Sequence, residues 1–179
     1  MTIPIVLSSY EQQCLTDVFG PEVPLDVVRF RLGGALSYGA SRTIGNNISM
    51  QTQWQFHRNE PIFLGLLVHE VVHVWQYRHV GWAYAWGALW EQTRARLKQG
   101  TRRVAYHYVL DETVEFRNYG YEQQAQMIQD WFLRARFAIY DGYTTDNCTN
   151  FGQLGELTAN QLIERYLLNV RVWSNRCPP

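Results

Sequence analysis

A segment in the first third of the chain alternates between apolar and polar residues and therefore predicts a β-strand. Val28, Phe30 and Leu32 alternate with arginines, which is the period of a strand with one solvated face. Two glycines follow Leu32 directly and end the pattern. We expect one strand here that buries its apolar side.

A second strand-like segment spans Arg42–Gln51. Ile44, Ile48 and Met50 share one parity along it, whereas Gly45 and two asparagines interrupt the alternation and suit a bulge or bend. We expect a single edge strand. Before both strands, residues 1–24 contain three prolines and predict an irregular arm with a short helix near residues 10–19.

The remaining chain is patterned mainly for helices. Residues 61–77 are apolar around most of the helical circumference, which predicts a largely buried helix. Residues 83–99 form a second candidate, with cations near its end and Gly100 as the C-cap. Amphipathic helices are also predicted at 121–140 and 157–173. A polar loop, residues 141–150, separates these two helices, and residues 104–110 fit either a third strand or an extended segment.

The composition favours one soluble globular domain. Apolar residues are 46% and charged residues 18% of the 179, which excludes a mainly disordered chain. Sixteen basic and sixteen acidic residues cancel, so we expect no nucleic-acid partner. The longest uncharged run, Val80–Trp90, is too short for a transmembrane segment, and the N-terminus lacks the regions of a signal peptide. We expect all three cysteines to be free thiols. The alternative is a disulfide between Cys148 and Cys177, which would leave Cys14 as a free thiol.

The segment LLVHEVVHVWQ contains an HExxH motif within the predicted helix at 61–77. Residues four apart lie one above the other on a helix, so His69 and His73 can share one Zn²⁺. Glu70 is offset by about 100° of helical rotation, which suits a general base that reaches a water molecule. The alternative is a cluster of hydrogen-bonded core side chains, which the apolar surroundings disfavour.

A catalytic zinc needs a third protein ligand. Glu122 is the best candidate because it begins the predicted helix at 121–140, in which the small Ala125 permits close approach to the HExxH helix. An ordinary first-turn glutamate is the competing interpretation. His57, His79 and His107 are rival ligands.

These motifs together resemble a known family. The order SRTIGNNISM, LLVHEVVHVWQ and YGYEQQAQMI is similar to gluzincin-like metallopeptidases of bacterial contractile injection systems. The likeness is strongest to the C-terminal metallopeptidase domain of type VI secretion spike proteins and to a related injection-system core domain. It covers residues 27–131 and implies Glu122 as the third zinc ligand.

The resemblance also implies a substrate path and a support for the metal ligands. In the relatives, the strand before the active helix is an edge beside the metal cleft, so Arg42–Met50 would pair with an extended peptide or protein substrate. Many gluzincins have an acidic residue four positions after the glutamate ligand, where this chain has Gln126. Asp130 or a backbone carbonyl would then have to orient a zinc-bound histidine.

We therefore expect a small α+β zincin-like domain, with a short, mostly antiparallel sheet packed on the HExxH helix. The expected function is zinc-dependent peptide hydrolysis by an antibacterial effector of a type VI secretion system. Such a toxin would leave the bacterial cytoplasm through the injection apparatus, act in the target-cell periplasm, and meet a spike protein and an immunity protein. The rival is a non-catalytic, zinc-stabilised adaptor, which a fourth protein ligand would favour.

Further residues have weaker claims on function. Trp82, Trp86 and Trp90 recur at helical spacing and are predicted to be core, although a membrane-facing or partner-facing surface is the alternative. The basic cluster from Arg94 to Arg103 is expected to be a solvated helix end rather than a site for an acidic partner. The residues near enough in sequence to donate to an oxyanion are Tyr106, His107, Tyr108, Tyr119 and Tyr121.

Overall fold

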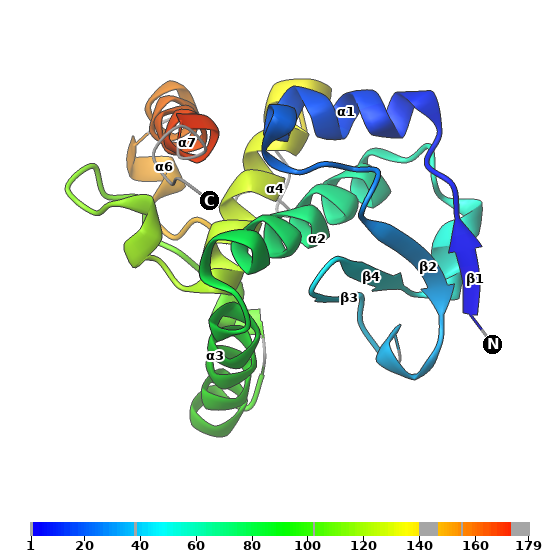
Figure 1. Cartoon of the computed structure of the whole chain (residues 1–179). Coiled ribbons are helices and arrows are strands. Elements are labelled where there is room, and N and C mark those ends of the chain that lie inside the picture. Colours follow the sequence, from blue (N-terminus) through cyan, green and yellow to red (C-terminus); the bar gives the residue numbers. More distant parts are fainter. Residues whose placement is uncertain (1, 38, 102, 140–146, 155, 173–179) are drawn as a thin grey trace.

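A four-stranded mixed sheet and a group of helices form the protein (Figure 1). The computed structural model describes residues 2–37, 39–101, 103–139, 147–154 and 156–172. The strands are β1 (Thr2–Ile5), β2 (Arg29–Gly33), β3 (Arg42–Ile44) and β4 (Asn47–Met50). The helices are α1 (Ser9–Phe19), α2 (Pro61–Val80), α3 (Ala83–Gln99), α4 (Tyr121–Phe137), α6 (Phe151–Leu154) and α7 (Glu156–Val172). The predicted α+β class is confirmed.

The strands lie in the order β1-β2-β4-β3. β1 pairs antiparallel with β2, and β3 pairs antiparallel with β4, whereas β2 and β4 are parallel. The alternation of β2 has the expected consequence, because Phe30 and Leu32 are buried and Arg29 is exposed. Gly33 and Gly34 follow with φ of 77° and 94°, a region that favours glycine, and the strand ends there.

Two predictions about the strands are wrong. The N-terminal arm is not irregular before its helix, because β1 adds to the sheet. The short helix expected near residues 10–19 is confirmed as α1, which begins at a capping box formed by Ser8 and Glu11. The segment Arg42–Met50 is a hairpin rather than one edge strand. Gly45, with φ of 60°, and Asn46 form its two-residue turn, so β3 is the edge and β4 lies inside the sheet.

Helix α2 contacts β3 and β4 and also packs against α4 (Figure 1). Its buried residues cover most of its circumference, as predicted. The two helices approach closely at Gly65, where an added Cβ would lie 2.9 Å from the Leu133 side chain. The apolar residues of α7 complete the core against α4, as expected. The predicted end at Tyr140 is three residues too late, because α4 ends at Phe137 and Ala138 caps it in the left-handed conformation. The other predicted end, Trp173, lies outside the described residues.

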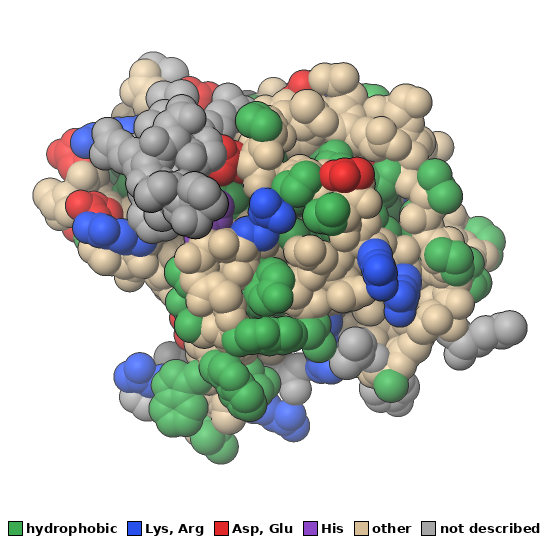
Figure 2. Space-filling view, viewed as in Figure 1, with side chains coloured by type: hydrophobic (Ala, Val, Ile, Leu, Met, Phe, Trp, Pro, Cys, Tyr) green, Lys and Arg blue, Asp and Glu red, His purple; other side chains and the backbone are tan. Residues whose placement is uncertain are grey.

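Helix α3 has the predicted bounds, and Gly100 ends it in the left-handed conformation. The prediction that its tryptophans are core is wrong, because Trp82, Trp86 and Trp90 are 54%, 72% and 67% exposed. Figure 2 shows apolar side chains gathered over this protruding helix. The tryptophans face outward because α3 contacts α2 and α4 through its opposite side.

Residues 104–110 form neither a strand nor a wholly extended segment. A 3-10 helix covers Arg103–Tyr106, and Tyr108 makes one isolated β-bridge to Cys148. Cys14 and Cys148 are buried free thiols, and Cys177 lies outside the described residues. In the described part of the chain, no helix has both the length and the apolar character needed to cross a membrane.

Candidate metal centre

Three buried side chains from α2 and α4 converge. His69 and His73 project from consecutive turns of α2, and Glu122 lies in the first turn of α4. Oε2 of Glu122 is 3.5 Å from Nε2 of His69 and 3.6 Å from Nε2 of His73. One ligand atom from each residue lies within 4.8 Å of the other two. The residues that sequence spacing selected are therefore brought together.

The geometry fits a metal ion. Ligand atoms held tetrahedrally at zinc bond lengths lie about 3.3 Å apart, close to the separations from Glu122 to the two histidines. Two imidazoles and one carboxylate are a common donor set for a catalytic zinc. The residues that the structure describes bring no fourth histidine, cysteine or carboxylate into this group. The cluster could hold a metal ion and leave a coordination position for another molecule.

The charges in the cluster are strongly coupled. Burial acts to lower the pKa of His73, but Glu122, together with Glu70 and the hydrogen bond to Gln76, outweighs burial and raises that pKa to about 9. Burial likewise acts to raise the pKa of Glu122, yet His73 and His69 hold that pKa well below its usual range. A metal ion would replace the proton on His73, so metal binding at neutral pH should release protons.

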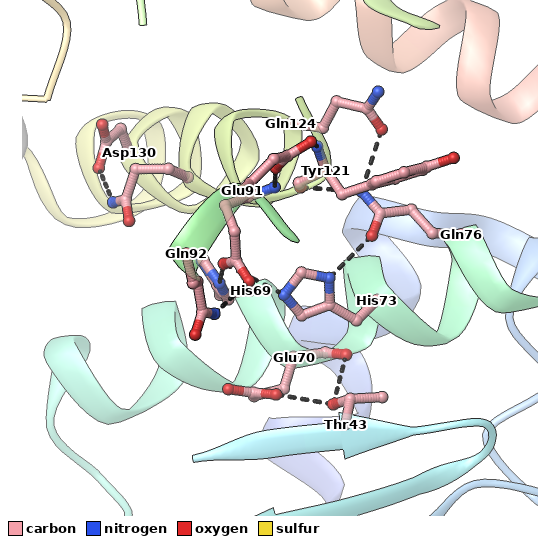
Figure 3. A network of polar contacts seen from close by, with 12 residues as sticks. Thr43, His69, Glu70, His73, Gln76, Glu91, Gln92, Tyr121, Gln124 and Asp130 are labelled. Atoms are coloured by element: carbon pink, nitrogen blue, oxygen red, sulfur yellow. Dashed lines mark hydrogen bonds and ion pairs between the residues drawn. The ribbon is translucent and has the colours of Figure 1, made fainter. Parts of the chain in front are cut away.

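Glu70 lies on the side of α2 that faces β3 (Figure 3). Its Oε2 accepts a hydrogen bond of 2.7 Å from the Thr43 hydroxyl, and the Glu70 carbonyl lies 3.1 Å from the same hydroxyl. Both residues are buried. Tyr84 donates from its hydroxyl to the Thr43 carbonyl at 2.8 Å. The edge strand thus holds the predicted base in place, a contact that spacing alone did not reveal.

Helix α3 supports the carboxylate ligand from its inner side. Gln92 donates through Nε2 to Oε1 of Glu122 at 2.6 Å, which leaves Oε2 to the histidines. The Glu91 carboxylate accepts from the backbone N–H groups of Tyr121 and Glu122 at 3.1 and 3.2 Å. An anion at this position is favoured because it meets the positive end of α4. Sequence reasoning missed both residues.

Gln76 fixes the orientation of His73. Its Nε2 donates to the Tyr121 carbonyl and to Oε1 of Gln124, both at 3.0 Å, so its own Oε1 faces Nδ1 of His73 at 2.7 Å. A carbonyl oxygen only accepts, and this assigns the orientation of the Gln76 amide. The proton of neutral His73 then lies on Nδ1, which leaves Nε2 free to bind a metal. Gln76 is one turn after His73 on the same face, a signal that the sequence contained.

The expected support from Asp130 is not present. Its carboxylate accepts from the Tyr108 hydroxyl at 2.9 Å and from Gln126 Nε2 at 2.7 Å, and it does not belong to the cluster. The prediction failed because Asp130 is two turns from Glu122 and packs beside Tyr108. The side-chain amide of Gln76 orients His73 instead, whereas Nδ1 of His69 has no hydrogen-bond partner among the described residues.

The rival histidines lie outside the cluster. His57 contacts the exposed Glu60, and His79 contacts the Trp75 carbonyl. His107 does not join the group either. Among the proposed oxyanion donors, Tyr106 is the one placed beside a ligand, with its ring 5.9 Å from that of His69.

The other proposed donors have different contacts. Tyr108 donates to Asp130, and the Tyr119 hydroxyl donates to the Val109 carbonyl. The ring of Tyr121 packs against Tyr84 and against Gly87 of α3.

Comparison with known proteins finds no family model, no curated protein and no solved structure that matches this chain. The resemblance to injection-system metallopeptidases therefore stays a prediction.

Proposed function

We propose that this protein is a zinc-dependent, gluzincin-like hydrolase of peptide or amide bonds. The observation that carries the proposal is the buried group of His69, His73 and Glu122 on two packed helices, with Glu70 next to it. Three ligands and a neighbouring carboxylate are what hydrolysis requires, whereas a structural zinc site is usually closed by four protein ligands rich in cysteine.

The residues of the site have different roles in the proposed reaction. Zinc bound by His69, His73 and Glu122 would supply a Lewis acid that acidifies water and polarises the scissile carbonyl. Glu70 would take a proton from the attacking water and later give it to the leaving amine. The Thr43 hydroxyl, which donates to Glu70 at 2.7 Å, keeps this carboxylate oriented without occupying its second oxygen.

The edge of the sheet supports a place for an extended substrate. β3 pairs with β4 on one side, and α2 with the candidate base packs beside it. An extended peptide could add by backbone hydrogen bonds to the side of β3 away from β4, where the Thr43 carbonyl also accepts from the Tyr84 hydroxyl. Since β4 is internal, the substrate edge expected for Arg42–Met50 narrows to Arg42–Ile44.

The biological setting is proposed from the resemblance alone. A type VI secretion effector would leave the bacterium with a spike protein, act in the target-cell periplasm, and be neutralised by an immunity protein in its producer. The proposed zinc-dependent hydrolysis of peptide bonds is consistent with a toxin of this kind.

The test separates metal binding from chemistry. We expect purified protein to carry close to one zinc per chain, and His69→Ala or His73→Ala to lose it. Glu70→Gln should keep zinc but lower peptide cleavage or toxicity by about 10²–10⁴-fold, since only the proton acceptor is removed. Glu112→Gln changes an exposed glutamate and serves as the matched control.

Two outcomes would contradict the proposal. Full zinc content in both histidine variants would mean that the ligands are assigned wrongly. If Glu70→Gln retains zinc and affects target cells as severely as the wild type, the protein acts without catalysis. The adaptor function would then replace the hydrolase.

A further inference from the structure

The outer face of α3 is an exposed apolar stripe, formed by Trp82, Trp86, Leu89, Trp90 and Leu97. Trp86 and Trp90 expose about two thirds or more of their surfaces, and Leu97 is 80% exposed. Large apolar side chains that gather on one face of a protein mark an interaction site. The residues lie on one protruding helix, so a partner can reach all of them together (Figure 2).

The charges beside the stripe follow a pattern. With about 100° of rotation per residue, the stripe occupies an arc of about 100°. Arg96 lies directly beyond one border of this arc, and Arg94 lies beyond the other. Both arginines are exposed, and they are the exposed charged side chains that the structure describes on α3. Figure 2 shows basic side chains on both sides of the apolar group.

The inner face of α3 is already used. Tyr84 and Ala88 are buried, and Glu91 and Gln92 hold the first turn of α4. The buried and exposed residues thus occupy opposite sides of one helix. The stripe is therefore not a partly covered core face, because α3 packs into the protein through its opposite side.

We propose that the outer face of α3 binds the surface of an anionic lipid bilayer. Tryptophan favours the boundary between lipid headgroups and acyl chains, and leucine adds apolar area below it. Arginines on both borders of the stripe would reach up to lipid phosphates while their stems lie along the apolar surface. The arrangement is that of a helix lying in the plane of the membrane.

The charge pattern argues against a second copy of the chain as the occupant. A two-fold contact through this stripe brings the same face of each copy together. Because both borders carry arginine, a contact with the two helices parallel would place the arginines of one copy beside those of the other. An anionic lipid surface complements both borders at once.

The experiment measures binding to vesicles by co-sedimentation. We expect the wild type to bind vesicles of phosphatidylcholine and phosphatidylglycerol in equal parts, and to bind pure phosphatidylcholine much more weakly. Trp86→Ser/Trp90→Ser should reduce binding to the anionic vesicles roughly tenfold or more. Phe56→Ser, which removes another exposed aromatic side chain outside α3, should leave binding unchanged.

A second variant tests the borders without removing apolar surface. Arg94→Gln/Arg96→Gln should weaken binding to anionic vesicles by about thirtyfold, since each basic residue near an anionic surface contributes about 1 kcal/mol. Binding to neutral vesicles should not change. Circular dichroism shows whether the tryptophan variant folds. If it does not fold, the arginine variant alone tests the proposal of membrane binding.

The proposal is overturned if the wild type does not bind anionic vesicles, or if neither double variant reduces binding. It is also overturned if the protein forms a concentration-dependent dimer that Trp86→Ser/Trp90→Ser abolishes, because the stripe would then be an interface between copies. Zinc content and peptide cleavage in solution should be the same in all these variants. A failure of the hydrolase proposal therefore gives a different result from a failure of this one.

Discussion

Helix α4 carries two buried carboxylates, and their surroundings shift their pKa values in opposite directions. Glu122, in the first turn, faces two histidines that hold its pKa well below the usual range against the effect of burial. Asp130, two turns later, is equally buried, and its hydrogen bonds come from the neutral Tyr108 and Gln126. Burial raises the pKa of Asp130 to about 7, although these hydrogen bonds and the charge of Arg134 partly oppose it.

The difference shows that the partners, more than the depth of burial, decide the charge of a buried carboxyl group. Glu122 remains an anion and is therefore ready to bind a cation. Asp130 is close to neutral at acidic pH and serves the packing between α4 and Tyr108. One helix thus places a candidate metal ligand and a structural carboxyl group two turns apart.

Removing the Glu122 carboxylate is expected to have the strongest consequence for metal binding. Glu122→Ala should lose bound zinc while keeping its helical content, because α4 retains its buried apolar residues, including Ile128 and Phe132. The matched variant Asp130→Asn should keep zinc at the wild-type level. Metal analysis with circular dichroism measures both. Normal zinc content in Glu122→Ala together with lost helicity would make Glu122 a structural residue.

The second prediction concerns the pH dependence that Asp130 imposes on stability. Its folded pKa of about 7 lies above the unfolded value of 3.8, so the folded state holds a proton that the unfolded state releases. The stabilising contribution is present below the unfolded pKa and is lost as the pH rises from about 4 to about 7. The loss amounts to about 4 kcal/mol.

Urea denaturation of the wild type and Asp130→Asn across this range measures the contribution. The stability of the wild type relative to the variant should fall steadily between the two limits, because groups common to both proteins cancel. A constant difference would mean that Asp130 ionises in the fold as it does in water. The contrast between the two carboxylates would then rest on Glu122 alone.

Much of the metal centre could be predicted from the sequence because helical spacing is local. The four-residue interval fixed His69 and His73 on one face, and Glu70 beside them. The choice of Glu122 over the rival histidines as the third candidate ligand rested on the family resemblance, because no local sequence rule shows which helix packs against α2. Gln92 and Thr43 come from other elements, and their contacts with Glu122 and Glu70 depend on the tertiary arrangement.

Local patterns were less informative where tertiary contacts decide the outcome. The tryptophan spacing on α3 correctly predicted a helix with a continuous stripe, but the stripe is exposed because α2 and α4 lie on the other side. The hairpin at Arg42–Met50 carried a usable signal. Gly45 and Asn46 form a two-residue turn between two short strands, although the interrupted alternation at these residues equally suits the predicted bulge.

A weaker effect is expected from Gln76, the residue that orients the candidate ligand His73. Gln76 accepts from Nδ1 of His73, the role that the sequence suggested for Asp130. Gln76→Leu should weaken zinc binding by about 10–100-fold, the usual effect of removing a residue that orients a ligand. Competition with a chromophoric chelator measures this affinity.

Gln76→Glu separates this role from the link between α2 and α4. A glutamate keeps an acceptor for Nδ1 of His73 but has no proton to donate to the Tyr121 carbonyl or to Gln124. If orientation of His73 is what matters, Gln76→Glu should bind zinc nearly as well as the wild type while Gln76→Leu does not. Equal losses in both variants would instead show that Gln76 acts by holding the two helices together, because both variants lose the donated hydrogen bonds.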